Sequence, residues 1–361
     1  MFIQNETLID FCIFRLLLNK KIRLKTILSI DCGTQSLRAA LFSPEGEMLA
    51  IQRVLFEPYK SSQPGWAEQD PEVYWQALTE ACQKLKAEVP EFFEKIAGVG
   101  VTTMRDSLVN VDEQGNPLRP LMVWLDQRKA APVYKPGIIM KIIIWFIGMT
   151  DSIQKAQRDG KCNWIRQNQP EIWKKTHKFL QVSGLLNFRL TGTFRDSVAS
   201  QIGHVPFDYK RQKWGNPKRL FVFSAKLYPI EKDKLPELVK PGETIGQITE
   251  WAAEKTGLPA GLPVIACGSD KGCETLGMGV LNNETASLSF GTTATIQTTS
   301  KKYREPIRYM PSYPAVYPGY FNPEVEIFRG FWMISWFKNE CARSEVVIAR
   351  ELGIPVEKLV D

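Results

Sequence analysis

Two short glycine–threonine segments in this 361-residue chain are suited to holding phosphate groups. Residues 28–35 read LSIDCGTQ and residues 288–294 read LSFGTTA, so each is an apolar run that enters a Gly-Thr turn. Glycine lets the backbone approach an anion, and successive N–H groups attract negative charge. Two such turns facing each other would hold a polyphosphate, with Asp31 placed to bind Mg²⁺ directly or through water. Taken singly, such a segment is more simply interpreted as a hairpin turn, where Asp and Gly are common.

Asp270 is the candidate for acid–base chemistry. It lies in the segment CGSDKGC (residues 267–273), which follows the apolar run 262–266. A carboxylate at a strand-to-helix turn stands at the open end of a sheet, where it can accept the proton of a substrate hydroxyl. The alternative, which spacing alone favours, is that Asp270 only caps the following helix.

Arg105 and Asp106 are candidates for binding a polyol. They follow the predicted strand 96–101, and together they offer a planar fork of donors beside an acceptor, which suits adjacent hydroxyls. Trp124 would supply an apolar wall for the carbon skeleton. A surface ion pair and a core aromatic are the alternative interpretations.

The elements that must position these residues alternate between strands and helices, which predicts an α/β fold. Tight turns join the first three predicted strands, so we expect an antiparallel meander at the start of a mixed sheet. Asp70, Pro71 and Glu72 predict a helix start. The predicted strands are 26–30, 37–42, 48–54, 96–101, 108–111 and 262–266, and the other predicted helices are 164–190, which is mostly helical, and 251–256.

Composition and charge exclude several classes of protein. With 44% hydrophobic and 24% charged residues, the chain is neither disordered nor fibrous. The net charge of +7 is small and dispersed, so we expect no nucleic-acid partner. Seven scattered cysteines without a Cys-x-x-Cys pair favour reduced thiols in the cytoplasm. His177 and His204 have no metal-ligand neighbours at suitable spacing.

Two apolar stretches call for an interpretation. Residues 8–18 are too short and too charged to span a bilayer, and we treat residues 1–25 as an N-terminal extension outside the core. Residues 138–146 read as a buried helix or an interfacial piece. We therefore expect no membrane partner.

Taken in order, the motifs resemble the FGGY carbohydrate kinase family. The resemblance runs from about Thr26 to at least Thr299 and rests on IDCGTQSLR (30–38), GWAEQDP (65–71), WLDQR (124–128), GSD (268–270) and SFGTT (289–293). It implies an actin-like (ribonuclease H-like) ATPase fold, with a complete first domain over 26–280 and an incomplete second domain over 281–361. It also implies transfer of the γ-phosphoryl group of ATP to a sugar or polyol hydroxyl, with ATP and Mg²⁺ as cofactors.

The resemblance carries roles onto matching positions. Asp31 would be the metal-associated acidic residue, and Asp270 the catalytic base in contact with substrate. The two phosphate loops would be formed by Gly33, Thr34, Gln35, Ser36 and Arg38, and by Gly291, Thr292 and Thr293. The substrate-contact positions would be Met104, Arg105, Asp106 and Trp124.

The chain also departs from the family's pattern. Residues 104–106 combine features of glycerol kinases and xylulokinases, and Lys271 stands where the family often has Gln or Asn. These two departures leave the identity of the sugar or polyol substrate undecided. Family members usually continue far beyond the second phosphate loop. We therefore expect a truncated product, inactive or weakly active alone, that exposes Trp332, Trp336 and Phe337.

Two alternatives and one assembly complete these expectations. The first alternative to a kinase is a non-catalytic sugar-binding or regulatory module that keeps the first domain. An actin-like filament protein is a remote third reading, because Arg105, Asp106 and Trp124 would then have no role beside the phosphate loops. A homodimer is a candidate assembly.

Overall fold

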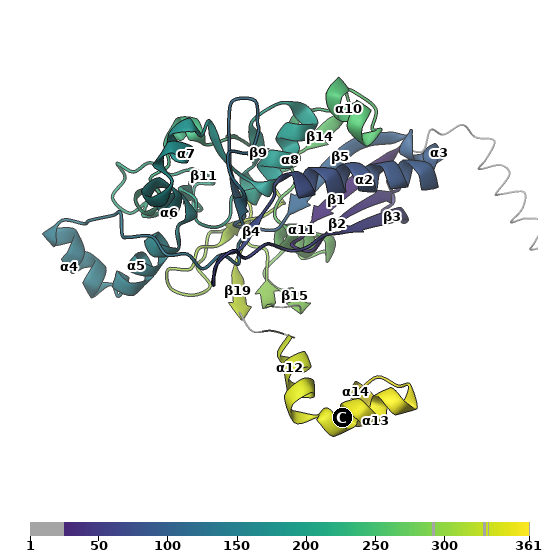
Figure 1. The fold of residues 1–361 in the computed structure, drawn as a ribbon. Coiled ribbons are helices and arrows are strands. Elements are labelled where there is room, and N and C mark those ends of the chain that lie inside the picture. The colour runs from purple at the N-terminus through teal and green to yellow at the C-terminus, as the bar shows by residue number, and fades with distance from the viewer. Residues whose placement is uncertain (1–24, 291–292, 328–329, 331, 361) are drawn as a thin grey trace, which may run out of the picture.

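A six-stranded mixed sheet forms the centre of the molecule (Figure 1). The computed structural model describes residues 25–290, 293–327, 330 and 332–360. The strands of this sheet are β1 (Thr26–Cys32), β2 (Ser36–Phe42), β3 (Met48–Leu55), β5 (Ile96–Thr103), β13 (Thr244–Gln247) and β14 (Pro263–Ile265). Their order is β13-β14-β5-β1-β2-β3, in which β5 is parallel to β1 and to β14, and the other pairs are antiparallel. The predicted meander and the α/β class are confirmed.

Helix α2 (Glu72–Glu88) packs against the sheet and encloses the main core. Inward-facing Leu28 and Ile30 of β1 are fully buried, as is Leu78 of α2. The helix starts within the predicted segment but one residue later than expected, because Pro71 is its N-cap and Glu72 its first residue. The Asp70 carboxylate accepts a hydrogen bond from the Glu72 N–H at 3.0 Å. This core holds β1 and β5 side by side, and so fixes the loops that follow them.

A four-stranded sheet, in the order β4-β7-β6-β8, corrects one prediction. Its strands are β4 (Glu68–Gln69), β6 (Leu108–Val111), β7 (Leu121–Met122) and β8 (Lys178–Gln181). The region 164–190, predicted mostly helical, contains α6 (Lys161–Asn168), α7 (Pro170–Lys175) and α8 (Val182–Thr191), but β8 separates the last two. Residues 178–181 are extended because they pair antiparallel with all of β6, a partner that local sequence does not reveal.

The remaining elements surround these sheets. A three-stranded sheet contains β15 (Ser287–Phe290), β16 (Ala294–Gln297) and β19 (Glu324–Ile327). Two-stranded pairs join β9 (Arg195–Ser197) to β12 (Glu237–Val239), β10 (Phe207–Asp208) to β11 (Lys213–Trp214), and β17 (Tyr313–Pro314) to β18 (Phe321–Asn322). The other helices are α3 (Pro90–Phe93), α4 (Ile138–Phe146), α5 (Thr150–Asp159), α9 (Ser224–Leu227), α10 (Glu250–Thr256), α11 (Asp270–Gly277), α12 (Trp332–Cys341), α13 (Arg343–Leu352) and α14 (Glu357–Val360), with 3₁₀ turns η1 (Val198–Ser200) and η2 (Lys232–Lys234).

Helix α4 overturns the expectation of a buried helix at 138–146. Ile138, Trp145 and Phe146 are 79%, 74% and 82% exposed, and Ile144 is the residue of α4 that the protein buries. The helix packs on α5, and most of its apolar side chains stay outside the core. Within the part of the chain that the structure describes, no helix combines the length and hydropathy needed to cross a bilayer.

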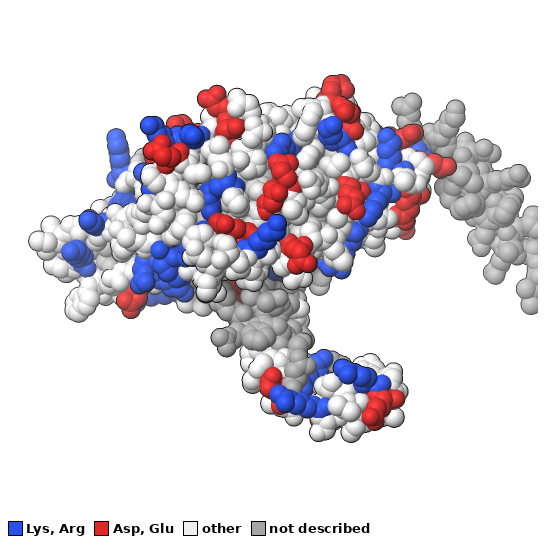
Figure 2. Space-filling model, in the orientation of Figure 1, with Lys and Arg blue, Asp and Glu red and all other residues white. Residues whose placement is uncertain are grey.

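Three further predictions can be compared with the described residues. Basic and acidic side chains are interspersed on the face in Figure 2, as expected for a dispersed charge. The six described cysteines are free thiols, and Cys12 lies outside the described residues. Trp336 and Phe337 of α12 are 50% and 47% exposed, whereas the side chain of Trp332 lies outside the described part.

Candidate active site

The candidate residues gather at one edge of the central sheet. Strands β1, β5 and β14 are parallel, and Asp31, Met104 and Asp270 lie at or just beyond the carboxyl ends of these strands. Asp31 is paired with Thr102 in the β1–β5 register, and a β-bridge joins Thr103 to Ser269. Because the carboxyl ends of parallel strands meet at the same edge, the three segments converge there.

Asp270 is the first residue of α11 and is not its N-cap. The cap is Ser269, whose hydroxyl accepts from the Gly272 N–H at 3.3 Å, so the capping alternative for Asp270 is wrong. Asp270 Oδ1 accepts from the Lys271 N–H at 2.7 Å, and 29% of its side chain stays exposed. Burial raises the pKa of Asp270, although the Arg105 guanidinium opposes the change. A raised pKa moves the carboxyl toward the range in which a general base works well at neutral pH.

Arg105 is fixed by a buried partner. Its Nη1 and Nη2 donate to the two carboxylate oxygens of Glu324, both at 2.9 Å, while its Nε lies 3.9 Å from Asp270 Oδ1. The Glu324 side chain is only 1% exposed, and the ring of Tyr313 lies 5.4 Å from the Arg105 guanidinium. Burial lowers the pKa of Arg105, but Glu324 outweighs burial and raises it, so the guanidinium stays charged beside Asp270.

Asp106 is paired on the other side of the same turn. It accepts from Lys161 Nζ at 2.6 Å, from His204 Nδ1 at 2.7 Å and from the His204 N–H at 2.8 Å. Burial acts to raise its pKa, but the charges of His204 and Lys161 bring the pKa below its ordinary value. Asp106 has a φ of 54°, and a Cβ at Gly203 would lie 2.4 Å from its Oδ1, so glycine alone fits there. Arg105 and Asp106 therefore both reach the site already partnered.

The first predicted phosphate loop touches the predicted substrate residues. Its turn is closed by a hydrogen bond from the Gly33 N–H to the Ser36 carbonyl at 2.9 Å. The Thr34 hydroxyl accepts from Trp124 Nε1 at 3.0 Å and donates to the Met104 sulfur at 3.6 Å. The structure thus brings Thr34, Met104 and Trp124 together.

Asp31 and Arg38 form an ion pair of 2.8 Å across the β1–β2 hairpin, where they are register partners. Asp31 is 35% exposed at its side chain. Among the described residues there is no cluster of three or more His, Cys, Asp or Glu that would enclose a metal ion. Magnesium is commonly held by one or two carboxylates together with phosphates and water, so a single carboxylate at the mouth of the site fits that role.

The second predicted phosphate loop is partly described. Gly291 and Thr292 lie outside the described residues, whereas Thr293 is half-buried just before β16. Strands β15 and β16 pair as an antiparallel hairpin, with Phe290 opposite Ala294. Lys271 Nζ donates to Ser289 Oγ at 2.8 Å, which ties the hairpin to the helix that carries Asp270.

Two motifs of the sequence, GWAEQDP and WLDQR, pack on each other, and the Ala67 N–H donates to Asp126 Oδ2 at 2.8 Å. The Arg128 guanidinium lies over the rings of both Trp66 and Trp164, 4.1 and 4.5 Å from their centres, and the two rings contact each other edge to face with centres 5.5 Å apart. It also pairs with Asp126 at 2.6 Å and Glu68 at 2.9 Å. This buried cation, in contact with two rings and two carboxylates, braces the segment that presents Trp124.

Sequence reasoning missed four residues that contact the candidate site: Lys161, His204, Tyr313 and Glu324. Glu324 lies 219 positions from Arg105, and no local pattern marks it as a partner. His204 was considered only as a metal ligand. Lys161 stands in the polar stretch QRDGKCNW (157–164), which gives no local signal for a partner 55 positions away.

Comparisons with known proteins agree with this geometry. The sequence model described as the FGGY family of carbohydrate kinases, N-terminal domain, matches residues 26–277. An uncharacterized sugar kinase of Escherichia coli K12, YgcE, is 28% identical over 338 residues, which are 93% of this chain and 61% of that protein. A xylulose kinase of Lactococcus lactis is 25% identical over 271 residues, 75% of this chain and 52% of that protein.

Solved structures establish the fold. The crystal structure of a xylulose kinase from Brucella ovis superposes with a TM-score of 0.74 at 20% identity, covering 92% of this chain and 65% of that one. Such structures have the actin-like ATPase fold, which confirms the predicted fold class. The chain spans 52–61% of the length of the two curated relatives.

Proposed function

Because the chain belongs to the FGGY family of carbohydrate kinases, we propose that it transfers the γ-phosphoryl group of ATP to a hydroxyl of a sugar or polyol. The observation that carries the proposal is the position of Asp270. Its partly exposed carboxylate follows β14 at the carboxyl edge of the sheet, 3.9 Å from the fixed guanidinium of Arg105. A base with a raised pKa beside a polar binding surface is the arrangement that hydroxyl activation needs.

In the proposed reaction, Asp270 accepts the proton of the acceptor hydroxyl. The hydroxyl oxygen then forms a bond to the γ-phosphorus while the bond to the β–γ bridging oxygen breaks, and ADP leaves. Phosphoryl transfer requires little covalent chemistry from the protein, so alignment of the hydroxyl and neutralisation of phosphate charge supply most of the catalysis. Met104 and Trp124 would shape the acceptor site, where Arg105 would orient hydroxyls.

We assign ATP to the two glycine–threonine loops. Thr34 and its neighbours 33–36 and Arg38 would contact the phosphates from one side, and residues 291–293 from the other. Asp31 is the residue that would hold Mg²⁺, which would neutralise phosphate charge there. We place the reaction in the cytoplasm, because the six described thiols are free.

The test is phosphorylation of a panel of pentuloses, hexuloses and polyols by the purified chain, followed through ADP release. Asp270→Asn should lower turnover by roughly 10²–10⁴-fold, the usual contribution of a general base, and should keep the circular dichroism spectrum. Glu250→Gln is the matched control, because it also removes an acid from the first turn of a helix, α10, and should leave turnover unchanged. Near-normal turnover in Asp270→Asn would remove the assignment of the base.

Calorimetry separates the kinase from a sugar-binding module. A kinase should bind ATP with Mg²⁺ as well as the sugar, whereas a module that has lost transfer should bind the sugar alone. Sedimentation of the same samples tests the predicted homodimer.

A further inference from the structure

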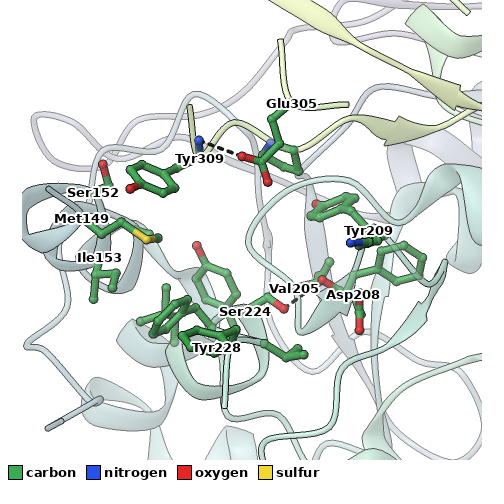
Figure 3. A pocket seen from close by; sticks show the side chains of 18 of the residues that line it. Met149, Ser152, Ile153, Val205, Asp208, Tyr209, Ser224, Tyr228, Glu305 and Tyr309 are labelled. Carbon is green, nitrogen blue, oxygen red and sulfur yellow. Dashed lines mark hydrogen bonds between the residues drawn. The ribbon is translucent and has the colours of Figure 1, made fainter. Parts of the chain in front are cut away.

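A large cavity lies outside the candidate active site. Its volume is about 940 Å³, and it is bounded by α5 and by three segments, residues 203–211, 219–228 and 303–313 (Figure 3). Asp270 and the other described residues assigned to phosphate and substrate do not line it. Pockets that hold small molecules span about 300–1,000 Å³, so this cavity is large enough for a ligand of its own.

Two residues of the lining contact residues of the candidate active site. His204 Nδ1 is hydrogen-bonded to Asp106 Oδ2 at 2.7 Å, and the ring of Tyr313 lies 5.4 Å from the Arg105 guanidinium. Arg105 and Asp106 themselves do not line the cavity. The cavity is therefore a separate site that adjoins the active site through these two side chains.

Two tyrosine hydroxyls of the lining lack partners. Tyr228 is 7% exposed, and its hydroxyl makes no hydrogen bond to any residue that the structure describes. The half-buried Tyr313 has an equally unpartnered hydroxyl within the described chain. Burial raises the pKa of Tyr228 well above its ordinary value and the pKa of Tyr313 to about 12, so both hydroxyls keep their protons. The cavity thus offers hydrogen-bond donors to a ligand.

The acidic groups of the described lining are already engaged. Asp208 pairs with Arg211 at 2.9 Å. Glu305 accepts from the Tyr309 N–H at 3.0 Å and from the Tyr303 hydroxyl at 3.2 Å. Neither carboxylate is left as a free acceptor for a ligand.

Two basic side chains of the lining are not neutralised. Lys210 and Arg219 are exposed, and neither forms an ion pair with a residue in the described ranges. The charges and polar groups that remain available are therefore cations and donors. Such groups attract a ligand that carries negative charge and accepts hydrogen bonds.

Apolar side chains make up much of the remaining wall. Leu220 and Phe221 are 54% and 64% exposed, and Met149, next to α5, is half-buried. Figure 3 shows Met149 and Ile153 on one side of the cavity and Tyr209 on the opposite side. An apolar body between these walls would remove exposed apolar surface from water, which is favourable.

We propose that this cavity binds a small amphipathic anion, which has an apolar body and a carboxylate or phosphate head. The body covers the apolar wall. The head accepts hydrogen bonds from the tyrosine hydroxyls and is attracted by Lys210 and Arg219. The site is independent of the proposed kinase function, because binding there requires neither ATP nor phosphoryl transfer.

The test is calorimetry of the purified chain with 2-naphthyl phosphate, 2-naphthoate, the neutral 2-naphthylmethanol and inorganic phosphate. At least one naphthyl anion should bind about tenfold or more tightly than both the neutral alcohol and inorganic phosphate. Which of the two anions binds more tightly identifies the head group.

The hydroxyls are tested by Tyr228→Phe combined with Tyr313→Phe, which keeps both rings. This variant should bind the naphthyl anion about tenfold more weakly, because a hydrogen bond to a charged group is lost. Tyr59→Phe combined with Tyr317→Phe changes two exposed tyrosines outside the lining and should keep the affinity. Tyr228→Phe alone is measured if the double variant has a lower melting temperature.

The cations are tested by Lys210→Met combined with Arg219→Met. This variant should narrow the difference in affinity between the naphthyl anion and the alcohol while leaving the affinity for the alcohol unchanged. Lys213→Met combined with Lys218→Met removes the same net charge from exposed positions outside the lining and should preserve the difference.

Equal affinities for the anions and the alcohol, binding that survives both pairs of lining substitutions, or no binding would overturn the inference. Displacement of the naphthyl anion by ATP with Mg²⁺ would also overturn it, because the anion would then occupy the nucleotide site. None of these measurements uses ADP release. Failure of this inference therefore leaves the kinase function standing, and absence of kinase activity leaves the cavity site standing.

Discussion

Arg105 and Glu324 lie 219 positions apart and form a bidentate ion pair, with both N···O distances at 2.9 Å. The pair joins the carboxyl edge of β5 to β19 of the three-stranded sheet. Glu324 also accepts from Gln297 of β16, which in turn accepts from Thr275 of α11. The guanidinium beside Asp270 is therefore held by residues that follow the second predicted phosphate loop.

Glu324→Gln should destabilise the protein. The change leaves the buried Arg105 guanidinium without its counter-charge, and breaking a buried ion pair costs about 3–5 kcal/mol. Urea unfolding measures the difference in the free energy of unfolding. Glu326→Gln, half-buried two residues farther along β19, is the matched control and should stay within about 0.5 kcal/mol of the wild type. Equal stabilities of the two variants would contradict the importance of the pair.

Asp106→Asn should also destabilise, because it strands the Lys161 ammonium, whose side chain is 4% exposed. We expect a loss of about 3–5 kcal/mol. The double variant Asp106→Asn with Lys161→Met removes both charges and should recover part of the loss, which thermal and urea unfolding would reveal. A double variant no more stable than Asp106→Asn would show that the loss does not come from the stranded charge.

The stability of Asp270→Asn relative to the wild type should depend on pH. Burial raises the pKa of Asp270 in the folded protein above its ordinary value of 3.8. At pH values between 3.8 and the raised pKa of the folded protein, the folded state binds more protons than the unfolded state. The free energy of unfolding of the wild type therefore falls as pH rises through this window. Asparagine does not titrate. Urea unfolding from pH 3.5 to 8 should therefore show the variant gaining stability relative to the wild type with rising pH, and a pH-independent difference would refute the burial effect.

Lys271→Met should move the acid limb of the kcat/KM profile to higher pH. Burial raises the pKa of Asp270, and the Lys271 ammonium opposes that change. Removing the charge lets the pKa rise further, so the base is protonated over a wider acidic range. Lys271→Arg keeps the charge and should leave the limb in place. The pH profiles of the three proteins check this, and identical limbs would exclude an influence of Lys271 on the base.

Several elements could be predicted because their signals are local. The apolar, strand-forming runs 26–30 and 37–42 are each followed by turn residues, and the Asp70–Glu72 helix start depends on adjacent groups. The strand at 178–181 was missed because its extended form depends on pairing with β6. The capping role assigned to Asp270 by spacing belongs to Ser269, one position earlier.

The sequence by itself determined the α/β class, the order of the motifs and the chemical types available at the candidate site, since these depend on residues close together in the chain. Only the tertiary structure decided which charges meet. Arg105 is partnered by Glu324, and Asp106 by Lys161 and His204, although nothing in their local sequences links them. The physical reason is that a buried charge needs an opposite charge in space, and the fold, not the spacing along the chain, brings that partner within reach.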